Sequence, residues 1–180
     1  MEIIKLIETA KDNNSRLSEV DLKDRIDEKK GLSCSISIDE NKSFQIFKGF
    51  GGAITEASGY VLSTLSEEKQ DEVLNAYFNE KLGNNLTFAR THMNSSDFSL
   101  ENWACVEEKD ETLESFSMER TDKYITPNLQ KANIIKNKKL KVMISTWSPP
   151  KWMKTNNDMN HGGKLLPQYK ELLAKYWVKF

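Results

Sequence analysis

From residue 49 onward the chain alternates short apolar runs with longer amphipathic ones, and this alternation limits the fold more than any other feature. The expected strands are 86–91 and 140–145, and segments 53–65 and 67–79 have the composition and spacing of helices. Strands that alternate with helices form parallel sheets whose crossovers are helical. The sequence therefore predicts an α/β fold from residue 49 onward.

Three further signals mark the residues at which helices begin. Ser66 is a candidate N-cap for 67–79, and Thr126-Pro127 predicts a helix start with Pro at its first position. Pro167 opens a last helix, whose apolar positions are Tyr169, Leu172, Leu173, Tyr176, Trp177 and Phe180. These offsets form one amphipathic stripe. The stripe is still running at Phe180, so we expect the chain to be a fragment cut within a helix.

Residues 1–48 have a different pattern, which predicts β structure. Residues 33–38 alternate polar and apolar side chains with a period of two, as a half-buried strand does, and 44–47 suggest a second strand. Residues 8–31 are highly charged and predict a solvated connection. We therefore expect a domain boundary between residues 48 and 49.

Charge and composition exclude several classes of protein. The 180 residues hold 26 Lys+Arg and 27 Asp+Glu, which provides no positive field for nucleic acid. No stretch approaches the ~20 apolar residues of a membrane span. The two cysteines and two histidines match no disulfide framework and no metal-ligand spacing, so neither a metal nor another cofactor is expected. No signal peptide begins at Met1, and the chain as given is expected to be cytoplasmic.

Two long polar loops, 91–121 and 146–164, follow the two predicted strands and contain the candidate site residues. Functional residues of α/β folds collect at the carboxyl ends of strands. Aromatic rings stack on the apolar face of a sugar, and carboxylates and amides bond to its hydroxyls. The candidates are Arg90, Asp97 and Trp147, with Asn94, Trp103, Trp152 and His161 as further pocket candidates.

Each candidate also has a structural alternative. A Trp at a strand end is often part of the core, and Asp97 fits the cap of a turn at Ser99-Leu100. Arg90 fits a structural arginine at the end of its strand. The residues alone leave these alternatives open.

Four motifs taken together resemble glycoside hydrolase family 30, the family of glucosylceramidase and microbial β-1,6-glucanases. They are Gly49-Phe-Gly-Gly-Ala-Ile-Thr-Glu-Ala, Arg90-Thr-His-Met-Asn-Ser-Ser-Asp-Phe-Ser-Leu-Glu-Asn-Trp, Trp147-Ser-Pro-Pro-Lys-Trp-Met-Lys-Thr-Asn and Met159-Asn-His-Gly-Gly-Lys. The resemblance implies a (β/α)8 barrel with a β-sandwich side domain. Residues 49–180 would supply barrel strands one to three, and residues 1–48 the first part of the sandwich.

The resemblance also implies a retaining mechanism with two Glu residues, an acid/base and a nucleophile. Neither position exists in this chain: its one Asn-Glu pair, Asn79-Glu80, precedes Lys81 instead of the family's Pro. The implied catalytic Glu residues lie beyond Phe180. The resemblance places Asp97 on glucose hydroxyls, Trp147 along the same subsite, and Arg90 beside the nucleophile region.

Three hypotheses follow. The first is a fragment of a retaining β-glycosidase that acts on a β-glucoside or β-glucan and is inactive as the isolated 180-residue chain. The second is a non-catalytic carbohydrate-binding remnant. The third is a half-barrel that needs a partner chain carrying the missing C-terminal part.

Overall fold

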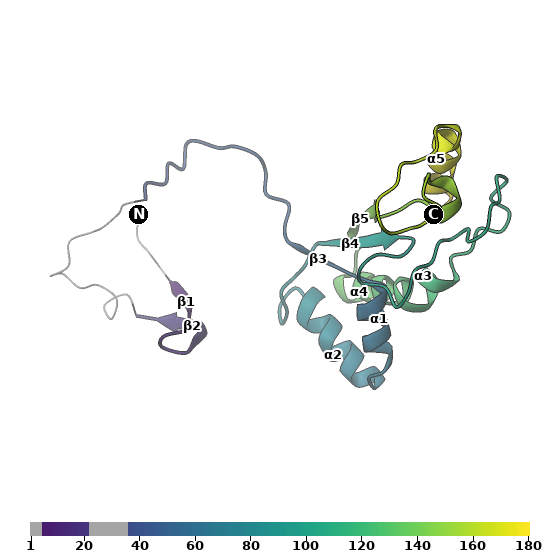
Figure 1. Cartoon of the computed structure of the whole chain (residues 1–180). Helices are drawn as coiled ribbons and strands as arrows, with labels where there is room; N and C mark the ends of the chain where they lie inside the picture. Colours follow the sequence, from purple (N-terminus) through teal and green to yellow (C-terminus); the bar gives the residue numbers. More distant parts are fainter. Residues whose placement is uncertain (1–4, 22–35) are drawn as a thin grey trace. The chain divides into compact units, whose positions relative to one another are not determined.

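The computed structural model describes residues 5–21 and 36–180 (Figure 1). The chain divides into two compact units, Met1–Gln45 and Ile46–Phe180. Each unit is described by itself.

The described part of the first unit contains a β-hairpin. Strand β1 (Leu6–Ala10) pairs antiparallel with β2 (Ser15–Val20), and the turn between them contains Asn14 at φ 58°. Asn tolerates the left-handed region better than most residues. The solvated connection expected at 8–31 is therefore wrong for residues 8–20, where alternating side chains and an Asn-rich turn form a hairpin.

The strand expected at 44–47 is also wrong. Residues 42–50 have no regular secondary structure, and Phe44, Ile46 and Phe47 are about 70% exposed or more. A strand needs a neighbour to complete its backbone hydrogen bonds, and no described strand pairs with this segment. Of the strand expected at 33–38, residues 36–38 are not a strand and the rest lies outside the described residues.

The second unit is built on a parallel sheet, as the sequence predicts. Its strands are β3 (Gly51–Ala53), β4 (Phe88–Met93) and β5 (Lys141–Thr146), in the order β3-β4-β5. Gly51 pairs with Phe88, and Phe88 pairs with Lys141. All three strands therefore end at the same edge of the sheet, from which the two long loops leave.

Helices connect the strands. They are α1 (Glu56–Ser63), α2 (Glu67–Phe78), α3 (Glu119–Tyr124), α4 (Thr126–Lys136) and α5 (Lys170–Lys179). Two 3-10 turns, η2 (Lys151–Met153) and η3 (Pro167–Tyr169), lie between β5 and α5. Ser66 caps α2 through a bond from Lys69 N, as predicted, and Pro127 lies in the first turn of α4. Thr55 caps α1 with a capping box, so this helix begins three residues later than the expected 53–65.

Two apolar clusters stabilise the second unit. The helix-side core lies where α1, α2 and α4 gather below the sheet in Figure 1; its residues are Ile54, Leu74, Phe78, Ala89, Ile125, Ala132 and Leu140. The loop-side core joins the two long loops to α5; its residues are Met93, Trp103, Cys105, Val106, Leu113, Met153, Tyr169, Leu173 and Tyr176. In the described ranges, 5–21 and 36–180, no helix is long and apolar enough to cross a membrane.

Candidate functional site

A hollow of about 250 Å³ lies at the carboxyl ends of β4 and β5. We call it the Asp97 hollow; its lining residues are Ser95, Ser96, Asp97, Asn102, Trp147, Ser148, Met159 and Asn160. All of them belong to the loops that follow these two strands. The structure thus brings two segments about 50 positions apart to one surface, at the edge where an α/β sheet places its functional residues.

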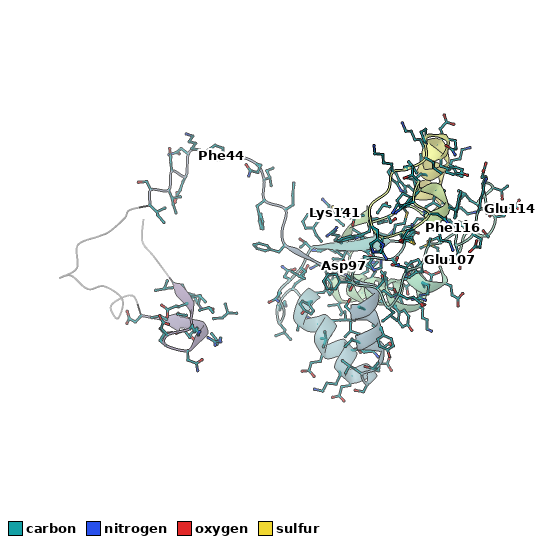
Figure 2. The ribbon with its side chains drawn as sticks, viewed as in Figure 1. Phe44, Asp97, Glu107, Glu114, Phe116 and Lys141 are labelled. Atoms are coloured by element: carbon teal, nitrogen blue, oxygen red, sulfur yellow. The ribbon has the colours of Figure 1, made fainter. Side chains whose placement is uncertain are left out.

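Asp97, labelled in Figure 2, carries an exposed carboxylate on this surface. Within residues 5–21 and 36–180 this carboxylate makes no hydrogen bond or ion pair. The alternative of a turn cap is wrong, because the side chains of Ser96 and Ser99 close the turn instead: Ser99 Oγ accepts from Ser96 N at 3.0 Å, and Ser96 Oγ accepts from Phe98 N at 3.2 Å. Asp97 therefore presents an unused acceptor to the hollow.

Arg90 and Trp147 form the adjoining side of the site. The Arg90 guanidinium lies over the Trp147 ring, 5.4 Å from its centroid, and its Nε donates to Ser145 Oγ at 3.1 Å. Both residues also line a neighbouring hollow of about 120 Å³, which shares Ser96 and Trp147 with the first. Trp147 is 50% exposed, so it is not a core residue, and part of its indole is open to a ligand.

Glu56 links the start of α1 to the first loop. Its side chain is fully buried, and its Oε1 accepts from Arg120 Nε at 2.8 Å and from the same guanidinium's Nη2 at 2.7 Å. Its Oε2 accepts from Trp103 Nε1 at 2.8 Å and from Leu100 N at 3.3 Å. A buried carboxylate is tolerated only with such compensation. These bonds fix the shape of the segment that carries Asp97.

His92 connects the same helix start to the end of β4. Its Nε2 accepts from Glu56 N at 3.1 Å, and its Nδ1 lies 2.6 Å from Asn94 O. A carbonyl oxygen can only accept, so Nδ1 carries the proton and the buried imidazole is neutral. The ring acts as a fixed link between backbone groups.

Asn94 is completely buried and links the two loops. Its Nδ2 donates to Ser148 O at 3.0 Å, and its Oδ1 accepts from Cys105 N at 3.1 Å and from the Tyr176 hydroxyl. Burial raises the pKa of the Cys105 thiol to about 11 and also raises the pKa of the Tyr176 phenol. Asn94 thus connects the two loops through buried hydrogen bonds and does not line the Asp97 hollow.

The remaining pocket candidates also lie outside the lining. Trp103 is 3% exposed and belongs to the loop-side core, so its core alternative is confirmed. Trp152 donates from Nε1 to Val106 O at 3.1 Å and packs edge-on against Tyr169. His161 is exposed and pairs with Asp158 at 2.9 Å. Among residues 5–21 and 36–180 no cluster of three His, Cys, Asp or Glu side chains could hold a metal ion.

The sequence reasoning missed several residues that the structure brings to the site. Asn102 and Asn160 line the Asp97 hollow, and the buried Glu56 pairs with Arg120, whose side chain is 30% exposed. Asn102 precedes Trp103 in a polar loop. This position was only a weak indication in the sequence that Asn102 lines the site. The Glu56–Arg120 pair joins residues 64 positions apart, so no local pattern could have revealed it.

The model of the glycosyl hydrolase family 30 TIM-barrel domain matches residues 47–180, about three quarters of the chain. The chain belongs to glycoside hydrolase family 30. The resemblance inferred from the four motifs is therefore confirmed, and the parallel sheet is part of a family 30 TIM-barrel domain.

Relatives within family 30 agree with this assignment. The chain is 34% identical over 151 residues to a putative glucosylceramidase 4 of Caenorhabditis elegans, covering 81% of this chain and 29% of the relative. It is 31% identical over 156 residues to the lysosomal acid glucosylceramidase of Mus musculus, covering 83% and 30%. A solved endo-β-1,6-glucanase superposes with a TM-score of 0.73 at 28% identity, covering 92% of this chain and 36% of that one.

The chain is thus glucosylceramidase-like in sequence. It spans less than a third of the length of the curated relatives it matches.

Proposed function

We propose that residues 49–180 supply the first three strands of a retaining β-glycosidase barrel and part of its sugar-binding surface. Residues 1–48 would be the first part of a β-sandwich side domain. The substrate would be a β-glucoside or β-glucan. The observation that supports this most is the unpaired carboxylate of Asp97 beside the exposed indole of Trp147.

Each of these side chains has a distinct role in the proposal. Asp97 accepts hydrogen bonds from sugar hydroxyls, and a charged acceptor of this kind contributes about 1.5–3 kcal/mol. The Trp147 indole packs against the C–H face of the pyranose. Arg90 holds that indole from one side and is itself fixed by Ser145. Together they hold a neutral sugar by its hydroxyls and by one apolar face.

The chemical step needs two further carboxylates. Retaining glycosidases place an acid/base and a nucleophile about 5 Å apart and pass through a covalent glycosyl-enzyme. We place both Glu residues in a part of the protein outside residues 1–180, because no Asn-Glu-Pro occurs in the chain. The isolated chain would therefore bind sugar without hydrolysing it, and activity would need the missing part of the barrel.

A second candidate is a carbohydrate-binding module without catalysis. The observation that favours it is that the two long loops form the Asp97 hollow by themselves, with Asn94 and Glu56 holding it from within the same unit. The two candidates differ in one respect: joining the chain to the remainder of a family 30 barrel restores hydrolysis only if the first is correct.

Ligand-observed NMR with methyl β-D-glucopyranoside tests the binding role. We expect saturable binding by the parent chain and at least a tenfold loss in Asp97→Ala. Asn84→Ala is a control, because Asn84 is an exposed residue before the start of β4 and lines none of the hollows described above. In parallel, we expect no release of nitrophenol from p-nitrophenyl β-D-glucopyranoside. Hydrolysis by the purified chain would contradict the placement of the catalytic pair.

A further inference from the structure

The segment 154–165 in the loop between β5 and α5 contributes to the Asp97 hollow, and the proposed function above gives it no role. Its two ends pair through a bridge between Lys154 and Leu165, and Thr155 N donates to Lys164 O at 2.9 Å. Between these ends the backbone adopts left-handed conformations, with φ 56° at His161, 74° at Gly162 and 81° at Gly163. The segment is therefore a tightly folded turn with a defined shape.

Three hydrogen bonds fix positions 159 and 160 in particular. The buried ammonium of Lys154 donates to Met159 O at 3.1 Å, and Asn156 Nδ2 donates to Asn160 O at 3.0 Å. Asn160 N donates to Asp158 Oδ1 at 2.8 Å. Burial lowers the pKa of Lys154, against the opposing charge of Asp158. A buried ammonium is costly, and here it orients one backbone carbonyl beside the hollow.

The side chains of these two positions are left for a ligand. Met159 and Asn160 both line the Asp97 hollow. Within the described ranges the Asn160 carboxamide makes no hydrogen bond, although its backbone N and O both do. A carboxamide offers two donors and an acceptor, and a thioether offers a soft apolar surface.

The charges of the lining indicate which sugar would fit. The hollow holds one carboxylate, two carboxamides, three Ser residues, one indole and one thioether, with neither Lys nor Arg among its lining residues. Arg90 lies in the adjoining hollow, where its Nε donates to Ser145 Oγ and its guanidinium lies over the Trp147 ring, and it is not among the lining residues of the Asp97 hollow. Within the Asp97 hollow an anionic sugar would meet the Asp97 carboxylate without a compensating charge, whereas a neutral sugar can bond to that carboxylate and to the two carboxamides.

We propose that Asn160 and Met159 form a second recognition surface of the sugar site, which selects an uncharged sugar over a uronic acid. This inference rests on the proposed function and names the substrate class of the same hollow. Asn160 bonds to a sugar hydroxyl, Met159 packs against its carbon skeleton, and Lys154 acts as a positioning residue through the Met159 carbonyl.

The test compares methyl β-D-glucopyranoside with methyl β-D-glucuronide by ligand-observed NMR titration of the 180-residue chain. We expect the parent to bind the glucoside at least tenfold more tightly. Asn160→Ala and Met159→Ala should each weaken glucoside binding about three- to tenfold, the effect of one neutral contact. Asn160→Arg should raise glucuronide affinity, a gain that misfolding cannot produce. Asn84→Ala and Asn84→Arg are the matched controls and should leave both affinities unchanged.

The outcomes separate this inference from the proposed function. If Asp97→Ala abolishes glucoside binding while both loop variants bind like the parent, the second recognition surface is refuted and the proposed function stands. Equal affinity of the parent for the two sugars, or no glucuronide gain in Asn160→Arg, also refutes it. If the parent binds neither sugar, the proposed function fails and this inference fails with it.

Discussion

The helix-side core and the loop-side core stabilise the same unit in different ways. The helix-side core packs apolar side chains against the sheet, and most of its residues lie in regular helices and strands, whose backbone groups pair with one another. Much of the loop-side core comes from irregular chain, and some of its backbone groups are paired by buried side chains, such as the Tyr176 hydroxyl that accepts from Cys105 N at 2.8 Å.

The two cores therefore contribute differently to the stability of the unit and to the shape of its site. Apolar packing is non-directional and tolerates many arrangements of similar volume. The bonds of Glu56, His92 and Asn94 are directional, and each links a specific pair of segments. We infer that the helix-side core mainly stabilises the unit, whereas the buried polar side chains determine where Asp97 and Trp147 lie.

Glu56→Ala should cause the largest loss in the free energy of unfolding. It tests most directly the role that we give to the buried polar side chains. The change leaves the buried Trp103 indole N–H and the Leu100 N–H without their acceptor, whereas Arg120, 30% exposed, keeps Glu101 as a partner. An orphaned buried donor costs about 1–3 kcal/mol and a lost hydrogen bond to a charged group about 1.5–3 kcal/mol, so we expect a total loss of about 3–5 kcal/mol. Urea unfolding followed by Trp fluorescence measures the loss, and Glu56→Gln, which keeps the shape, should lose less. A decrease below about 1 kcal/mol in Glu56→Ala would contradict the role given to this carboxylate.

Leu74→Ala should have a somewhat smaller effect, confined to stability. Leu74 is 3% exposed in the helix-side core, and removing its buried methyl groups costs about 2–5 kcal/mol. Under conditions where the variant remains folded, its affinity for methyl β-D-glucopyranoside should equal that of the parent. A folded Leu74→Ala with weakened sugar binding would show that the two cores are not separable.

Alkaline pH should produce the smallest effect, part of which comes from the Cys105 thiol in the loop-side core. The pKa of the Cys105 thiol is raised by burial to about 11, so above pH ~8.5 the unfolded chain loses this proton before the folded chain does. The folded state then binds more protons, and stability falls as pH rises toward 11, by at most about 1.4 kcal/mol per pH unit.

Cys105→Ala removes this contribution, whereas burial, the largest cause of the raised pKa of Tyr176, acts in both proteins. Urea midpoints measured between pH 8 and 11 should therefore fall more steeply in the parent than in the variant. Parallel pH profiles would indicate that the thiol is not as buried as the structure places it.

Much of the second unit could be predicted because its signals are local. The cap at Ser66 and the Pro at 127 placed α2 and the start of α4 within about one residue, and β5 was placed within one. The incorrect predictions concern segments whose structure cannot be inferred from the local sequence pattern. Residues 44–47 have strand-like alternation without a partner, and β3, only three residues long, was assigned in part to a helix.

The site could be predicted only in part for the same reason. Asp97, Trp147 and Arg90 were found because their types and their position after strands favour sugar binding. Asn102 and Asn160 have no distinguishing pattern, since a polar loop contains many such residues and only folding selects those that line the hollow. Asn94 and Trp103, equally plausible in sequence, lie within the scaffold.

The sequence by itself determined the family, the parallel sheet and the two loops that carry the site, because periodicity, caps and motif order are properties of neighbouring residues. Only the tertiary structure decided which loop side chains are buried and which face a ligand. That choice depends on contacts such as Glu56 with Arg120 and Asn94 with Ser148, whose partners are 64 and 54 positions apart. Their geometry exists only once the sheet has brought the ends of its strands together.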